Sequence, residues 1–159
     1  MSTQLPTKLA VDQWHSKIKD TNNLLSKITD EQLLMEVSPG RNTGTYILGH
    51  LVAVHDRMLP LLNLGERIHP ELDEIYLENP DKAKPQTLTG ADLRDLWNKI
   101  NAELATQFIT LTEQEWLQRH TAVSEEAFEK EPHRNRLNVL LNRTNHLSYH
   151  QGQLALLKI

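Results

Sequence analysis

Residues 43–64 read TGTYILGHLVAVHDRMLPLLNL. Positions three and four residues apart share one face of an α-helix, and in this stretch that face is largely apolar. It carries Ile47, His50, Leu51, Val54, Met58 and Leu61. Pro60 falls inside the pattern, where it removes a backbone donor and crowds the residue four positions earlier. We therefore expect a helix over about 43–64 whose last turn is kinked or shortened.

Further helical segments are expected on both sides of this one. Residues 7–37 contain no Pro or Gly and carry broken apolar periodicity, which predicts a long helix. A third segment runs from about 89 to 109. A short helix should follow it, with Thr112 as the N-cap and Glu115 completing a capping box. The last segment spans about 134–157 and is apolar around much of its circumference, as a helix packed between neighbours should be.

Pro and Gly mark three connections, at residues 38–40, 65–90 and 124–132. The portion over 66–89 is long enough to run the length of a helical bundle, and its prolines favour an irregular crossover. No segment shows sustained alternation with a period of two. The sequence therefore predicts an all-α four-helix bundle with a long crossover between its second and third helices.

The composition excludes several classes of protein. Among 159 residues, 38% are hydrophobic and 24% are charged, as in an ordinary folded domain. The formal net charge of −4 and the lack of a basic run argue against direct contact with nucleic acid. There is no cysteine, so any thiol chemistry needs a thiol from outside. Without a signal segment or a long apolar run, we expect a cytoplasmic protein with no membrane partner.

Three histidines are candidates for one metal site. His146 and His150 lie one turn apart on the last predicted helix, beside its apolar stripe, and can bind the same ion. His50 lies in the apolar stripe of residues 43–64, where a buried imidazole needs a partner. Gly49 before it lets a neighbouring backbone approach closely. Alternatives remain open, because His50 alone fits a core histidine satisfied by a carbonyl, and the pair alone fits a solvated helix face.

The other histidines are expected on polar faces or in connections, at the surface. They are His15, His55, His69, His120 and His133.

Two local sequences carry a family resemblance, YILGHL over 46–51 and NHLSYHQGQL over 145–154. Together they resemble the DinB/YfiT-like superfamily of helical bundles. Its usual signatures are Gly-His-Leu on the second helix and Asn-His-x-x-x-His-x-Gly-Gln on the last. In layout the resemblance covers nearly the whole chain, long crossover included, and it implies a single bundle domain over residues 1–159.

The resemblance implies that His50, His146 and His150 bind one divalent transition metal ion, with nickel or zinc favoured and iron or manganese as alternatives. It also implies a homodimer. The chain departs from the family pattern at Gln151, where Arg is frequent, and at Asn142, where a further His is frequent. Neither departure removes a ligand, but both concern substrate preference.

Four more residues are candidates for the surroundings of the site. Tyr149 and Gln153 flank His150 on the last helix and are candidates for supporting or pocket roles. Arg41 and Asn42 lie in the turn before the His50 helix and are candidates for contacts with an anionic substrate. Packing for the first two, and a solvated turn for the others, are the ordinary alternatives.

Three neutral imidazoles leave an ion its double charge and at least one open position, as in catalytic rather than closed structural sites. Water or a small thiol bound there would be acidified. Leu147 stands where a His-Glu-x-x-His peptidase has its Glu, so that chemistry is rejected. A di-iron site is also rejected, because the one Glu-x-x-His spacing, Glu66 to His69, lies in an expected loop.

Three functions follow as hypotheses. The first is a metal-dependent enzyme acting on a small molecule, by transfer of a low-molecular-weight thiol or by hydrolysis or isomerisation, as the resemblance implies. The second is a non-catalytic, stress-associated protein that binds a metal or a ligand. The third is a helical oligomer whose histidines satisfy one another. Metal analysis of untagged protein separates the third from the first two.

Overall fold

The structure is a computed structural model, and it describes residues 4–158. Helices and their connections make up all of this part of the chain, which holds no β-strand but only two isolated bridges, Glu36 with Thr43 and Arg119 with Asn135. The all-α prediction is confirmed. Over the same residues, no helix combines the length and apolar character needed to cross a bilayer.

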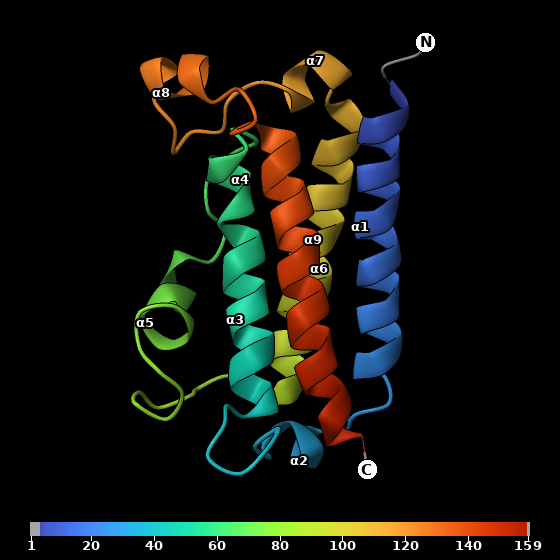
Figure 1. Ribbon diagram of the computed structural model, residues 1–159. Helices are drawn as coiled ribbons and strands as arrows, with labels where there is room; N and C mark the ends of the chain where they lie inside the picture. The colour runs from blue at the N-terminus through green and yellow to red at the C-terminus, as the bar shows by residue number, and fades with distance from the viewer. Residues whose placement is uncertain (1–3, 159) are drawn as a thin grey trace.

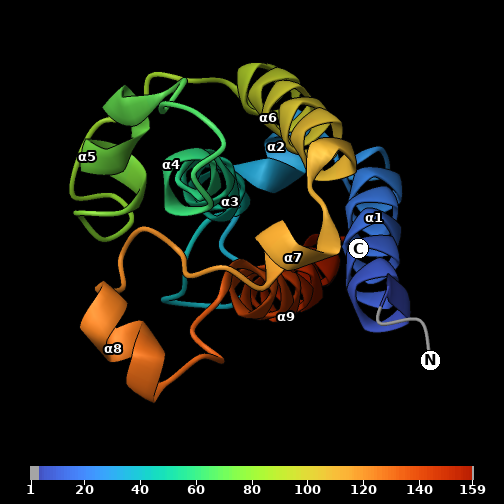
Figure 2. The ribbon, with the colours of Figure 1, turned by 90° about the horizontal axis from the view of Figure 1, so that it is seen from above.

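The four longest helices stand side by side (Figures 1 and 2). They are α1 (Gln4–Leu25), α3 (Gly44–Asp56), α6 (Gly90–Thr110) and α9 (Arg136–Leu154). Seen end-on in Figure 2, α3 lies between α6 and α9, and α1 closes the ring on the other side. In Figure 1, α3 and α6 both run upward and α1 and α9 both run downward. Two successive parallel helices require the chain between them to return the length of the bundle.

Short helical elements lie in the connections and after the end of α9. The seven elements are α2 (Asp30–Leu33), α4 (Met58–Leu61), η1 (Pro70–Leu72), α5 (Asp73–Tyr76), α7 (Glu113–Trp116), α8 (Glu125–Lys130) and η2 (Ala155–Leu157). α7 begins as expected, since the Thr112 hydroxyl accepts from the backbone N–H of Glu115 and the Glu115 side chain accepts from Thr112.

Two predicted helices are interrupted. The segment expected over 7–37 ends at Leu25, and Thr29 caps the separate helix α2. The segment expected over 43–64 breaks at Arg57, between α3 and α4. Pro60 explains the position of the second break. Its ring crowds the carbonyl of Asp56, four residues earlier, and α3 ends at that residue.

Three short helices were missed in predicted connections: η1 and α5 in the crossover, and α8. α8 lies within 124–132, where the Ser124 hydroxyl accepts from the N–H of Ala127 at 3.2 Å and two glutamates occupy the first turn. These are regular helix-start signals. The helix has no buried residue, so the apolar periodicity that identified the longer helices is absent from it.

His55 lies in the core, and the prediction that it lies at the surface is wrong. Its side chain is 0% exposed and packs between Trp14 and Trp97, with ring centroids 4.7 and 4.8 Å away. Its Nδ1 lies 2.8 Å from the Asn101 side-chain oxygen of α6, and burial lowers its pKa to about 3. Neighbouring elements cover α3 on almost every side, so the helix has no polar face at this position. The hydrogen bond with the Asn101 amide makes a buried neutral imidazole tolerable.

The crossover is fixed to the end of α3 by a buried carboxylate. Asp56 is fully buried and accepts the backbone N–H groups of Ile68 and His69, at 2.8 and 3.0 Å. Arg67 donates to Asp56 at 2.6 Å and to Asp73 in α5. These bonds hold η1 and α5 beside α3, as Figure 1 shows. The predicted irregular crossover therefore contains short helices at a fixed place.

Candidate metal centre

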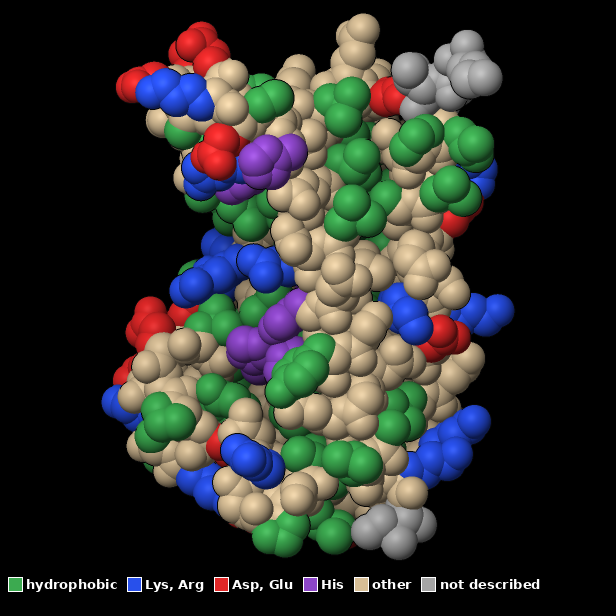
Figure 3. Space-filling view, in the orientation of Figure 1, with side chains coloured by type: hydrophobic (Ala, Val, Ile, Leu, Met, Phe, Trp, Pro, Cys, Tyr) green, Lys and Arg blue, Asp and Glu red, His purple; other side chains and the backbone are tan. Residues whose placement is uncertain are grey.

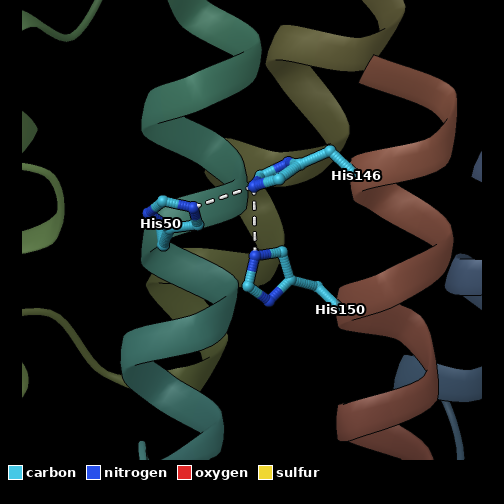
Figure 4. Close-up of side chains that lie close together, drawn as sticks. All are labelled: His50, His146 and His150. Atoms are coloured by element: carbon cyan, nitrogen blue, oxygen red, sulfur yellow. Dashed lines mark hydrogen bonds between the residues drawn. The ribbon is translucent and has the colours of Figure 1, made fainter. Parts of the chain in front are cut away.

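The three candidate histidines lie together between α3 and α9 (Figure 4). His146 Nε2 lies 3.2 Å from Nε2 of His50 and 3.1 Å from Nε2 of His150. His50 comes from α3, and the other two come from successive turns of α9. One ring nitrogen from each residue lies within 4.8 Å of those of the other two, and each side chain is partly buried. The sequence-based grouping of these residues thus corresponds to one cluster in space.

Two of the rings are oriented through their other nitrogen. His50 Nδ1 lies 3.0 Å from the backbone oxygen of Tyr76, and His150 Nδ1 lies 2.7 Å from Oε1 of Gln153. Both oxygens are acceptors, so each Nδ1 carries the hydrogen and donates it. The Nε2 atoms of His50 and His150 then present unprotonated lone pairs toward His146.

This arrangement leaves the cluster short of hydrogens. Neutral His146 has a single N–H, which can serve only one of the two lone pairs that face its Nε2. Its Nδ1 is buried and has no partner among the described residues. A cation at the centre would instead accept all three Nε2 lone pairs. Two nitrogens on a tetrahedral zinc ion, each about 2.0–2.1 Å away, lie about 3.3 Å from one another. The observed separations of 3.1 and 3.2 Å are close to that value, so the residues fit a metal ion.

The electrostatics also suit a metal site. Burial lowers the pKa of all three imidazoles, and for His146 the charges of the two neighbouring histidines and Arg143 help to lower it to about 4. The rings are therefore neutral at pH 7, the form in which imidazole binds a metal. Since protons compete weakly here, the donors remain available in mildly acidic solution.

Tyr76 was missed in the sequence and supports His50 in two ways. Its carbonyl accepts the Nδ1 hydrogen, and its fully buried ring packs against Gly49, where an added Cβ would lie 2.3 Å from Cε1. Gly49 was expected to admit a backbone; the structure corrects this, because an aromatic side chain occupies the space. Tyr76 lies in the crossover. The one signal in the sequence was Gly49, which indicated that another group approaches α3 closely but not which residue supplies it.

The four further candidates have different positions. Asn42 lines a cavity of about 150 Å³ together with Tyr46, His50 and His150. Gln153 holds His150, as described above, and its Nε2 donates to the Tyr149 hydroxyl at 3.3 Å. Tyr149 is 65% exposed, with its ring 5.0 Å from that of His150. Arg41 lies exposed in the preceding turn and is not among the residues that line the cavity.

A larger cavity, of about 500 Å³, lies near α8 and is lined by residues that include Gln118, Arg119, Phe128 and Arg136. Volume alone would favour it as the functional site. Its lining contains no group of three clustered ligand side chains, whereas His50, His146 and His150 form such a group. We therefore place the candidate site at the histidines, where the chemistry lies.

The protein is an all-α helical bundle with a three-histidine cluster between two of its long helices. The family model of the DinB superfamily matches residues 13–154, which is most of the chain. The chain belongs to the DinB superfamily. A comparison with curated proteins gives no match.

Proposed function

We propose that the protein is a metal-dependent enzyme that acts on a small molecule, with His50, His146 and His150 holding one divalent transition metal ion. The observation that carries the proposal is the meeting of three Nε2 atoms, two of them on rings fixed by Nδ1 hydrogen bonds. A divalent ion held by neutral imidazoles alone keeps its double charge and an open position, and it lowers the pKa of water or of a thiol bound there.

Transfer of a small thiol fits the residues better than hydrolysis. Hydrolytic metal sites commonly use a carboxylate as the general base beside the ion. Among the described residues, no carboxylate hydrogen-bonds to the three histidines or acts on their pKa. A thiol would need only to lose its proton to solvent, and its sulfur would then bond to an electrophilic carbon of the other substrate as that carbon's leaving group departs with the electron pair of its bond. His50 and His150 also line a cavity with Asn42 and Tyr46, where a small molecule would lie beside the cluster.

A second candidate is a non-catalytic metal-binding protein. The cavity of about 150 Å³ favours it, because small-molecule sites usually measure about 300–1,000 Å³. In that case removing the ion would lower the melting temperature strongly, and no combination of thiol and electrophile would give turnover. Nickel or zinc as the ion, a homodimer and a stress-related role stay predictions from the family resemblance.

Metal analysis of protein purified without an affinity tag tests the proposal. We expect about one equivalent of a divalent transition metal per chain, lost in His150→Ala with helical content retained. His15→Ala is the matched control, because His15 is exposed on α1, away from the cluster. Full metal content in His150→Ala, or none in the wild type, would contradict the proposed metal site. Thiol consumption with a panel of electrophiles then separates the enzyme from the binding protein.

A further inference from the structure

Arg143 is a cation without a partner beside the histidine cluster. It lies on α9 one turn before His146 and two turns before His150, so the three side chains share a side of the helix. Its Nε is buried, and its guanidinium makes no hydrogen bond or ion pair with any described residue. A buried, unpaired guanidinium nitrogen is costly, which suggests that its partner is a molecule the chain itself does not supply.

The charge of Arg143 is directed at the cluster. It helps to lower the pKa of His50 and His55 of α3 and of His146 on its own helix. The guanidinium therefore lies toward the α3 side of α9. In Figure 3, Lys or Arg side chains lie directly above a group of histidines at mid-height, in a waist between the lobes that contain α5 and α8.

Among residues 4–158, no carboxylate shifts the pKa of the three histidines. The charged groups that shift the pKa of the three histidines are neighbouring histidines of the cluster and, for His50 and His146, Arg143. Asp81 is the carboxylate that helps to raise the pKa of Tyr46 and Tyr76, close to the cluster. It already accepts hydrogen bonds from the Thr43 N–H and the Gln86 amide. With a divalent ion on neutral donors, the formal charge of the site would be about +3. Such a site attracts anions strongly, since charges in a partly buried region are poorly screened.

We propose that the small molecule taken by this site is anionic, and that Arg143 binds its carboxylate or phosphate group while a second atom of the same molecule occupies the open metal position. This inference rests on the proposed metal site. It assigns Arg143 a role in specificity, because an uncharged molecule of the same size would leave the guanidinium unpaired. A planar guanidinium binds such oxyanions through two parallel N–H donors, which a lysine cannot reproduce.

Cobalt(II)-loaded protein and two small thiols test the inference. 3-Mercaptopropionate carries a carboxylate and 2-mercaptoethanol does not, and the sulfur-to-cobalt absorption reports binding of either thiol at the metal. We expect Arg143→Met to weaken mercaptopropionate about 10- to 100-fold and to change mercaptoethanol less than threefold, with Arg143→Lys in between. Arg134→Gln removes one positive charge just before α9 and should leave both affinities unchanged.

The outcomes separate this inference from the metal proposal. Cobalt binding by wild type and Arg143→Met, with equal mercaptopropionate affinity in both, would overturn the role of Arg143 and leave the metal site standing. Failure of the wild type to bind cobalt would overturn both. If circular dichroism shows that Arg143→Met is unfolded, the Arg143→Lys variant decides, and an unchanged preference for the charged thiol over the neutral one then refutes the inference.

Discussion

Two glycines on the helices of the candidate site should respond in opposite directions to the same substitution. In an exposed helix interior, Gly→Ala stabilises by about 0.5–1 kcal/mol, because the unfolded chain loses freedom and the helix gains a better former. Gly152 on α9 meets this condition: it is exposed, and an added Cβ would find no atom within 4 Å. We expect Gly152→Ala to raise the free energy of unfolding by that amount.

Gly49 has the opposite environment. An added Cβ would lie 2.3 Å from Cε1 and 2.5 Å from Cδ1 and Cζ of Tyr76, whose ring is fully buried. Ordinary carbon contacts are about 3.5–4.0 Å, so the overlap exceeds 1 Å. Overpacking on this scale typically costs about 1–3 kcal/mol, and the gain in helix propensity offsets up to about 1 kcal/mol of it. We expect a net loss of up to about 2 kcal/mol for Gly49→Ala.

Urea unfolding followed by circular dichroism measures both changes. The Gly49→Ala variant should also bind metal more weakly, by about 10- to 100-fold, because the displaced Tyr76 carries the carbonyl that orients His50. If Gly49→Ala stabilises the protein as much as Gly152→Ala does, the close packing of Tyr76 on α3 is refuted. If it destabilises the protein and leaves metal affinity intact, the carbonyl does not set the ring orientation.

Two further predictions concern stability. The pKa of His55 is about 3 in the folded protein and about 6.5 when unfolded, so below pH 6.5 the unfolded chain takes up a proton that the folded one refuses. This residue should lower the free energy of unfolding toward pH 5 by up to about 1.4 kcal/mol per pH unit. Urea unfolding at several pH values measures this dependence, and the free energy of unfolding should change less steeply with pH in His55→Asn. Equal pH dependence in the two proteins would be incompatible with a neutral buried ring. Arg67→Met leaves the fully buried Asp56 without its cation. This variant should lose about 2–4 kcal/mol of the free energy of unfolding, and its crossover should become sensitive to proteolysis. Lys130→Met is the control, because its ion pair is exposed and its loss should cost less than about 0.5 kcal/mol. A resistant crossover in Arg67→Met would show that the backbone bonds to Asp56 suffice.

The long helices were predictable because each has an apolar face with helical spacing. Thr112 marked a helix start correctly, since a capping box is a local feature written in four residues. The meeting of the three histidines in space was also predicted, but through the resemblance of their surroundings to a family. Spacing alone left His50 open, because nothing local shows which helix faces it across the bundle.

The errors arose where distant contacts decide the outcome. His55 reads as polar in its own segment, and only the packing of Trp14, Trp97 and Asn101 around it shows a buried site. Tyr76 supports His50 from a crossover whose prolines predict irregular structure. Partners far along the chain decide what it costs to bury an imidazole and what a carbonyl acceptor contributes. The sequence pattern of one segment does not show those partners.

The polar anchors at the C-terminal end of α3 set the rotation of this helix about its own axis. His55 is held by α6 and Asp56 by the crossover, on different sides of the helix. Side-chain tips lie about 5–6 Å from a helix axis, so a rotation of about 10° would carry the His50 ring through about 1 Å. Ligand positions must hold to about 0.5 Å. Substitutions at these anchors, more than a turn from His50, would therefore weaken metal binding at the proposed site by turning the helix, with all three histidines still present.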